Sequence, residues 1–368
     1  MSDSETRALD DAFLRIVAAY NAGGEGCDET QFDALARALF AHQIERNEPY
    51  RRFAATLGYD DARPPATWRD IPAVPSSAFK DAILATFDPL QAELVFHTSG
   101  TTAAASGKHY IERAALYDAS LLAGFDRFML PGRPKLRYLL LVPNPRFAPH
   151  SSLGYMMGHV SVLRGEGHAA YFLSDDGVEA AAFARALDEA VAQQQPVCIA
   201  ATAFALVALL DGLAADGRTF AAPAGSRLME TGGFKGRTVA VEREELYARC
   251  TRALGIAPDS IVAEYGMTEL ISQYYDSPES RSSLLRVKCA PPWLRTLVVD
   301  SYGREVRDGE TGFLRHVDLG NRSSVVAVDT EDRGYRVPGG IVLLGRDLDA
   351  IPRGCSLDAE DLVAASKR

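Results

Sequence analysis

The stretch from His97 to Tyr110 carries the residue types best suited to holding an anion. It reads H-T-S-G-T-T-A-A-A-S-G-K-H-Y and follows an apolar segment, residues 94–96, that predicts the end of a strand. Small residues let backbone N–H groups turn toward a common point, hydroxyl groups add donors, and a lysine adds a positive charge. The glycine spacing differs from that of the P-loop, and a surface turn rich in small polar residues is the alternative. We predict a phosphate-binding loop composed of Thr98, Ser99, Gly100, Thr101 and Thr102, with Lys108 at its far end.

A second informative stretch is Glu264-Tyr265-Gly266-Met267-Thr268-Glu269, which follows a short apolar strand at residues 260–263. Its side chains are expected at the carboxyl end of that strand, where open α/β sheets bind ligands. A tyrosine can stack on a base, a threonine can donate to a phosphate, and a glutamate can hold Mg²⁺. An ordinary strand-to-turn transition is the alternative.

Two further segments have suitable chemistry. Thr231-Gly232-Gly233 begins another loop of small residues, after residues 226–230. Thr330-Glu331-Asp332 is followed by Gly345-Arg346, with Arg346 fourteen residues after Asp332. A carboxylate can bind both hydroxyls of a ribose, and an arginine can reach phosphates. Taken alone, this last pair favours a β-hairpin with a solvated acidic turn.

The elements that must position these residues alternate between helices and strands. The apolar periodicity predicts helices within residues 6–60, with a break at Gly23-Gly24, followed by a proline-rich connector at 63–75. Later predicted helices span 114–128, 177–195, 204–213 and 241–254, and predicted strands span 136–142 and 196–201. Short strands are predicted at 297–299, 312–314, 325–328 and 341–344. This order predicts an α/β fold with mixed sheets, a helical N-terminus and a β-rich end.

Composition sets limits on the function. The chain has 368 residues, of which 47% are hydrophobic and 24% charged, as in an ordinary globular protein. A net charge of −10 argues against binding nucleic acid by bulk electrostatics. We find no apolar run long enough to span a bilayer and no signal-peptide pattern. The five cysteines form no C-x-x-C pair, so we expect a reducing, cytoplasmic location.

Taken in order, these motifs resemble the signatures of the adenylate-forming superfamily, which contains acyl-CoA synthetases and peptide-synthetase adenylation domains. Further segments resemble one branch, the acyl-protein synthetases of bacterial bioluminescence. These are residues 71–80, 106–110, 151–153, 232–236, 309–312, 317–319 and 353–357. The resemblance covers about residue 70 to the end. It implies a large adenylation core at 76–345, preceded by a helical region at 1–75 and followed by a hinge-like remnant at 346–368.

The resemblance also implies a two-step reaction and a role for each motif. ATP and a carboxylic acid would give an acyl-adenylate, and a thiol would then take the acyl group. The loop from Thr98 to Thr102 and Lys108 would grip the β- and γ-phosphates. Gly232, Gly233 and Gly266 would shape the nucleotide site, with Tyr265 stacked on the adenine. Thr268 would contact the α-phosphate, Glu269 would hold Mg²⁺, Asp332 would hold the ribose, and Arg346 would contact the ribose or a phosphate.

The sequence departs from the superfamily pattern in two places. Ala103 stands where a glycine is usual, and the chain stops about twenty residues past Asp347, where other members carry a C-terminal domain. The bioluminescence branch is similarly short and uses a cysteine near its end as the acyl carrier, a place that Cys355 matches. A buried structural cysteine is the alternative for Cys355. His97 and His109 are interpreted as packing or hydrogen-bonding residues.

Three functions remain open on the sequence alone. The first is an adenylating ligase that passes the acyl group to a thiol, either Cys355 or a partner or carrier protein. The second is direct transfer to CoA, an amine or the pantetheine of a carrier protein. The third is a nucleotide-binding protein without turnover. The sequence does not identify the carboxylic acid.

Overall fold

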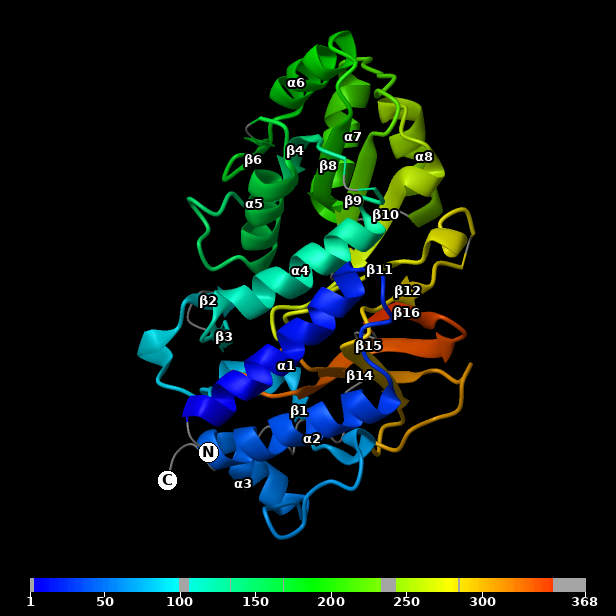
Figure 1. Ribbon diagram of the computed structural model, residues 1–368. Coiled ribbons are helices and arrows are strands. Elements are labelled where there is room, and N and C mark those ends of the chain that lie inside the picture. Colours follow the sequence, from blue (N-terminus) through cyan, green and yellow to red (C-terminus); the bar gives the residue numbers. More distant parts are fainter. Residues whose placement is uncertain are drawn as a thin grey trace. The chain divides into compact units, whose positions relative to one another are not determined.

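The computed structural model describes residues 3–98, 106–132, 134–167, 169–232, 243–283 and 285–346. The chain folds into two compact units (Figure 1). The first contains the chain up to Ala123, the segment Met267–Gln273 and the chain from Ala290 onward. The second contains Gly124–Gly266 and Tyr274–Cys289. The model confirms the predicted α/β class with mixed β-sheets.

Three N-terminal helices belong to the first unit: α1 (Asp3–Asn21), α2 (Glu29–Arg46) and α3 (Glu48–Thr56). They confirm the predicted helical region and its glycine-rich break. Helix α2 begins with a capping box, in which Asp28 accepts from the Gln31 backbone N–H and the Gln31 side chain accepts from Asp28. Its apolar face, including Phe32 and Leu39, is buried.

The proline-rich connector after α3 forms short elements in the first unit. These are the 3₁₀ helix η1 (Trp68–Asp70), the strand β1 (Val74–Pro75) and the 3₁₀ helices η2 (Ser76–Lys80) and η3 (Pro89–Gln91). Strand β1 pairs in parallel with β15 (Ala327–Val337). The connector is therefore integrated into the unit, although its prolines exclude a long helix.

Two antiparallel sheet regions complete the first unit. Strands β2 (Leu94–His97) and β3 (Lys108–Ile111) form a hairpin. Strands β13 (Leu294–Val299), β14 (Gly312–Asp318), β15 and β16 (Gly340–Arg346) form an antiparallel meander. Helix α4 (Ala114–Phe128) has the bounds that the sequence predicted, and it carries the chain across the boundary at Ala123.

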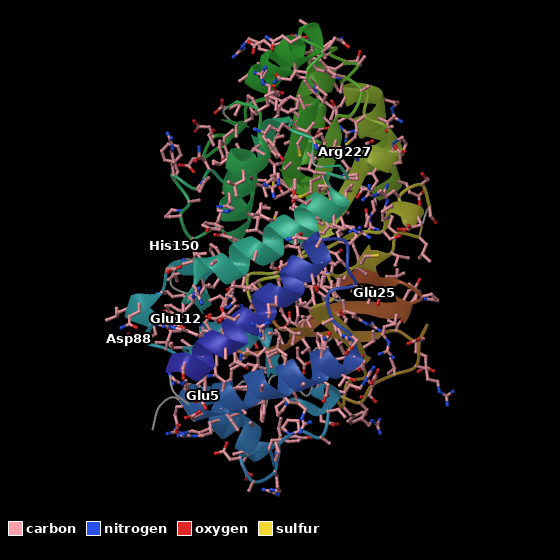
Figure 2. The ribbon with its side chains drawn as sticks, viewed as in Figure 1. Glu5, Glu25, Asp88, Glu112, His150 and Arg227 are labelled. Atoms are coloured by element: carbon pink, nitrogen blue, oxygen red, sulfur yellow. The ribbon has the colours of Figure 1, made fainter. Side chains whose placement is uncertain are left out.

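The second unit is built on parallel strands surrounded by helices (Figure 1). Their order is β5 (Ala170–Tyr171), β4 (Arg137–Leu141), β8 (Val197–Thr202), β9 (Arg227–Thr231) and β10 (Ile261–Tyr265). Strand β11 (Tyr274–Asp276) pairs antiparallel with β10, and β12 (Lys288–Cys289) pairs antiparallel with β11. In Figure 2, Arg227 marks the start of β9 and His150 the turn before α5.

The helices of the second unit are α5 (Ser152–Arg164), α6 (Ala180–Ala192), α7 (Ala203–Ala215) and α8 (Arg243–Leu254). Helix α6 packs on β4, and α7 packs on β8 and β9, around a core rich in leucine and alanine. Short elements complete the unit: strands β6 (Leu173–Ser174) and β7 (Gly177–Val178) and the 3₁₀ helices η5 (Pro258–Ser260) and η6 (Pro278–Ser280).

Two predicted boundaries were wrong for local reasons. The helix expected at 177–195 begins only at Ala180, because Gly177–Val178 pairs with β6 as a strand. The strand expected at 325–328 begins at Ala327, because the preceding valines belong to a buried connection. There the Val326 N–H donates to the side-chain oxygen of Gln43 at 2.8 Å.

The connection between β14 and β15, residues 319–326, is buried along its whole length. Arg322 lies in it with only 2% of its side chain exposed, and its Nε donates to Asp10 of α1 at 2.8 Å. A second guanidinium nitrogen of Arg322 pairs with Glu112, which is labelled in Figure 2. The Gln43 amide of α2 donates to the Asn321 carbonyl at 2.8 Å, so two N-terminal helices satisfy the polar groups of this segment.

Removing the Arg322 guanidinium is expected to destabilise the chain strongly. In Arg322→Ala, Glu112 loses a buried cation, whereas Asp10 keeps only the Arg113 contact at 2.8 Å. Breaking a buried pair costs about 3–5 kcal/mol, and we expect about 3 kcal/mol here because Arg113 remains. Denaturant unfolding measures the loss. The control is Arg304→Ala, whose exposed pair with Asp300 should cost no more than about 1 kcal/mol. Equal losses in the two variants would contradict this account of the buried segment.

Candidate active site

The residues that flank the predicted phosphate loop, Thr98 and Gly107, are hydrogen-bonded to each other at the end of the β2–β3 hairpin. The Thr98 N–H donates to the Gly107 carbonyl at 2.8 Å, and the Gly107 N–H donates to the Thr98 hydroxyl at 2.8 Å. Lys108 begins β3 directly after Gly107, and its side chain is exposed. Ser99, Gly100, Thr101 and Thr102 lie outside the described residues. The structure therefore places Thr98 and Lys108 at the same end of a hairpin, which the sequence did not predict.

Gly107 has no space for a side chain. A Cβ atom at this position would lie 2.7 Å from the Phe79 carbonyl carbon and 2.9 Å from the Lys80 nitrogen. Both atoms belong to η2, so any substitution at Gly107 must displace backbone. Residues 71–80 were noted in the sequence only through the family resemblance. In the structure, the end of this segment packs against the backbone at Gly107.

His109 joins the hairpin to the second motif. Its Nδ1 lies 2.7 Å from the Thr268 carbonyl oxygen, which fixes the tautomer with a hydrogen on Nδ1. The Thr268 hydroxyl donates in turn to the His97 carbonyl at 3.4 Å. Burial lowers the pKa of His109 to about 4, so the ring is neutral near pH 7. This agrees with the hydrogen-bonding role expected from the sequence.

Glu269 follows Thr268 and is held by the buried connection after β14. The Asn321 side chain donates to the Glu269 carbonyl at 2.8 Å and to the Val325 carbonyl at 2.9 Å. Only 8% of Glu269 is exposed. The backbone that presents the predicted Mg²⁺-binding carboxylate is thus fixed by a residue that sequence reasoning missed.

Asp318 fixes the residues that come after Glu269. Its carboxylate accepts from the N–H groups of Ile271 at 3.1 Å and Ser272 at 2.9 Å, and from the Ser272 hydroxyl at 2.9 Å. Complete burial raises the pKa of Asp318 to about 6, although these hydrogen bonds favour its charged form. In the sequence, Asp318 was noted only as part of residues 317–319, which resemble the family, and no role was assigned to it.

Asp332 and Arg346 meet across the β15–β16 pair. They are register partners, and the Arg346 Nε donates to the Asp332 carboxylate at 2.8 Å. The Asp332 N–H donates to the Thr330 hydroxyl at 3.1 Å. The predicted ribose carboxylate and the predicted arginine are therefore neighbours. The alternative, a β-hairpin with a solvated acidic turn, is present only as the hairpin, because Asp332 is buried within β15.

Within the second unit, Gly232 and Tyr265 lie at strand ends. Thr231 ends β9, Glu264 is its register partner on β10, and the threonine hydroxyl donates to the glutamate carboxylate. Tyr265 lies 5.5 Å from Tyr274, centroid to centroid, with tilted rings. Gly232 follows β9 with φ +90°, a conformation that favours glycine. Gly233 and Cys355 lie outside the described residues.

Comparison with solved structures identifies the fold. A 2-hydroxyisobutyryl-CoA ligase in an open conformation, with 2-HIB-AMP and CoA, matches with a TM-score of 0.61 and 14% identity over 87% of this chain and 71% of that one. VinN matches with a TM-score of 0.50 and 14% identity over 70% and 62%, respectively. ATP-bound MatB from Rhodopseudomonas palustris matches with 0.50 and 15% over 70% and 48%. The chain thus spans less than two thirds of VinN and MatB.

The fold and the ordered motifs define an ATP-dependent acyl-adenylate-forming enzyme. Residues 24–337 match the family model "Acyl-protein synthetase, LuxE", and the chain belongs to that family. The match begins earlier than the resemblance seen in the motifs, because it includes α2 and α3. Among curated proteins, no sequence relative matches the chain.

Replacing His109 should change how stability depends on pH. The folded state keeps His109 neutral down to about pH 4, whereas the unfolded histidine takes up a proton below its ordinary pKa of 6.5. Acidification from pH 6.5 to 4 therefore favours unfolding, by about 3 kcal/mol for this residue. His109→Asn keeps a donor near the Nδ1 position and removes the titration. Its free energy of unfolding should fall less steeply over this interval.

Urea unfolding at several pH values measures the difference between the two proteins. Other titrating groups, including buried His42 and His316, are common to both and cancel in the comparison. His150→Asn is the control, because His150 is exposed. Parallel curves for the wild type and His109→Asn would contradict the neutral, buried assignment.

Proposed function

We propose that this enzyme activates a carboxylic acid with ATP and Mg²⁺ and then passes the acyl group to a thiol. In the first step, a carboxylate oxygen bonds to the α-phosphorus, the bond from that phosphorus to the bridging oxygen breaks, and pyrophosphate leaves. In the second, a thiolate bonds to the acyl carbon, the bond from that carbon to the oxygen bridging it to phosphorus breaks, and AMP leaves with this oxygen. The observation that carries the proposal is the His109–Thr268 hydrogen bond at 2.7 Å, which joins two motifs distant in sequence.

Each described motif residue is assigned a role in the first step. Thr98 and Lys108 hold the β- and γ-phosphates, since they flank the predicted loop at the same end of the hairpin. Thr268 contacts the α-phosphate through its hydroxyl. The hydrogen bond from His109 to the Thr268 carbonyl fixes the backbone at this position. Because the developing charge lies on phosphate oxygens, these groups act by orientation and charge stabilisation. Ser99, Gly100, Thr101 and Thr102 complete the loop in this proposal.

The donor set suits Mg²⁺ bound together with a nucleotide. In the described part of the chain, no group of three or more histidine, cysteine or acidic side chains could hold a metal alone. Mg²⁺ commonly uses one or two carboxylates with phosphate oxygens and water. Glu269, on a fixed backbone, would supply the carboxylate, and the ion would neutralise phosphate charge when bound.

The remaining motif residues hold the nucleoside. Tyr265 stacks on the adenine, and Gly232, Gly233 and Gly266 leave room for its approach. Asp332 binds the ribose hydroxyls, and Arg346, paired with it at 2.8 Å, contacts the ribose or a phosphate. The pair suits this role because the hydrogen bond from the arginine orients the carboxylate.

The acceptor thiol is Cys355 or a thiol of a partner or carrier protein. The described cysteines are poor nucleophiles: burial raises the pKa of Cys198 and of Cys250 to about 12 and also raises the pKa of Cys27. The Cys289 pKa is raised in the same way. Direct transfer to CoA remains the second candidate, because the ligase with the TM-score of 0.61 was solved with CoA.

The first step can be tested by pyrophosphate release. We expect release from ATP and Mg²⁺ with at least one acid from a panel of fatty, aryl and amino acids. Lys108→Ala and Glu269→Ala should each lower kcat/KM by about 10²-fold or more, as loss of one charge-stabilising group does. Lys80→Ala, an exposed lysine in η2, is the matched control and should keep wild-type activity. ATP binding without release for any acid would reject adenylation and favour a silent nucleotide-binding protein.

The second step is tested with a radiolabelled acid that supports release. If Cys355 carries the acyl group, Cys355→Ser should keep pyrophosphate release and lose the hydroxylamine-sensitive label on the chain. Cys289→Ser, which removes a half-buried thiol, should keep both. A label retained in Cys355→Ser would exclude the relay and point to another acceptor. Release that requires added CoA or a carrier protein would identify direct transfer.

A further inference from the structure

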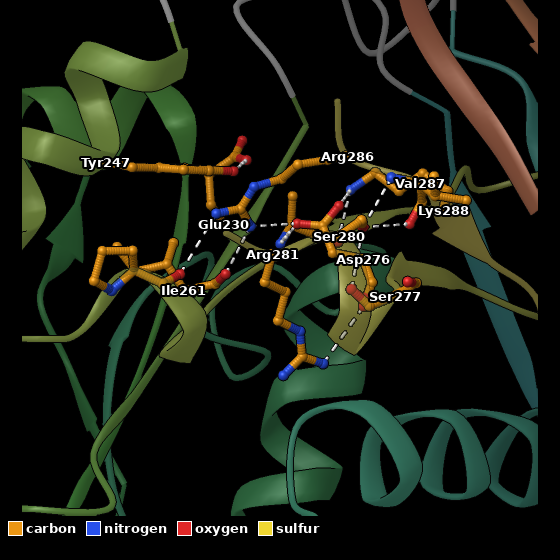
Figure 3. Close-up of polar contacts among 12 residues, drawn as sticks. Glu230, Tyr247, Ile261, Asp276, Ser277, Ser280, Arg281, Arg286, Val287 and Lys288 are labelled. Atoms are coloured by element: carbon orange, nitrogen blue, oxygen red, sulfur yellow. Dashed lines mark hydrogen bonds and ion pairs between the residues drawn. The ribbon is translucent and has the colours of Figure 1, made fainter. Parts of the chain in front are cut away.

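A buried charge cluster in the second unit contains more cations than carboxylates can neutralise. Asp276 is completely buried and accepts from Arg286 Nη1 at 2.7 Å and from Lys288 Nζ at 2.8 Å. Figure 3 shows both cations converging on this one carboxylate. The same two side chains also donate to the carbonyls of Ile261 and Ala263, at 2.8 and 2.7 Å. One negative charge therefore serves two buried positive charges.

Glu230 is the second carboxylate near this cluster. It accepts from the Tyr247 hydroxyl at 3.0 Å; burial raises the pKa of Glu230, and burial also lowers the pKa of Lys288. Arg281, 6% exposed, donates to the carbonyls of Phe128 and Asp276 rather than to a carboxylate. Its Nε is buried and has no hydrogen-bond partner among the described residues. An unmatched buried donor of this kind favours a nearby anion.

A pocket of about 460 Å³ opens over this cluster, between α8 and the segment after η6. Four arginines line it, Arg243, Arg252, Arg281 and Arg286, against a single carboxylate, Glu244. Arg243 is exposed. Arg252 forms an ion pair with Glu245, and this pair contributes little because both side chains are exposed to water. A concave surface with one sign of charge concentrates the field and attracts anions.

The rest of the lining limits the chemistry of the ligand. Tyr247, Ala248 and Pro258 form an apolar wall, and the Arg286 guanidinium lies 4.4 Å above the Tyr247 ring. The volume falls in the range of small-molecule sites and greatly exceeds that of a bare phosphate. An anionic group joined to an apolar or aromatic body therefore fits better than an inorganic ion.

We propose that this pocket binds a small organic phosphate. Its phosphate would meet Arg243 and Arg252, and its apolar body would lie along Tyr247 and Pro258. Arginine suits this task because its planar fork matches phosphate oxygens. No lining residue belongs to the motifs assigned to ATP. Binding of an organic phosphate in this pocket does not depend on the proposed function.

Calorimetric titration of the full chain with phenyl phosphate tests the proposal. We expect saturable binding by the wild type, with phenol and inorganic phosphate each binding at least tenfold more weakly. Arg243→Ala and Arg252→Ala should each raise Kd by at least about tenfold, as loss of one charge-assisted hydrogen bond does. Both residues are exposed, so the variants should fold. Arg249→Ala is the matched control, because Arg249 lies on α8 outside the pocket and pairs with Asp211.

Further arms separate this pocket from the nucleotide site. Lys108→Ala should leave phenyl phosphate binding unchanged. No binding by the wild type would overturn the proposal, and so would binding that is insensitive to both pocket variants. Binding lost in Lys108→Ala would place the probe in the phosphate loop instead. Equal affinity for inorganic phosphate would overturn the organic character of the ligand.

Discussion

The first unit depends on satisfying one polar segment inside its core. Residues 319–326 carry backbone groups and a guanidinium that are buried from water, and an unpaired group of either kind costs several kcal/mol. The partners come from far along the chain: Asp10 on α1, Gln43 on α2, and Thr86, whose N–H donates to the Ser323 carbonyl at 3.0 Å. The N-terminal helices are thus part of the scaffold of the site, although they contain none of its motifs. The family match, which begins at residue 24, includes α2 with Gln43 but not α1.

The same segment determines how the motif around Thr268 is presented. Asn321 holds the Glu269 carbonyl, Asp318 holds the two residues beyond Leu270, and His109 holds the Thr268 carbonyl. Three parts of one backbone stretch are therefore fixed from three places: β14, the connection that follows it, and β3. Fixing the main chain in this way lets the side chains of Thr268 and Glu269 take positions set before any ligand arrives. Such preorganisation is the largest contribution that a protein makes to phosphate chemistry.

The sequence predicted most of the fold, and its motifs supplied the residues that we propose to contact ATP. Glycine and hydroxyl-rich loops, the strand before Tyr265 and the Asp332–Arg346 pair are local signals, because their chemistry is determined by neighbouring residues or by a hairpin. The supporting contacts were not predictable, since Asn321 and Glu269 are 52 residues apart and His109 and Thr268 are 159 apart. The sequence around Asn321 does not indicate whether this amide side chain is buried or lies in a surface turn. The cationic pocket beside α8 was missed for the same reason: its arginines come from two distant segments.

The burial of the described thiols also bears on chemical fidelity. A protein that generates an activated acyl group can acylate its own nucleophiles, and thiolates would react first. Cys27, Cys198 and Cys250 are buried, and the fold keeps their sulfur atoms protonated at neutral pH. These side chains therefore add hydrophobic volume to the core without competing for the product of the first step. The packing thus shields these thiols, so the chain can use several cysteines as core residues.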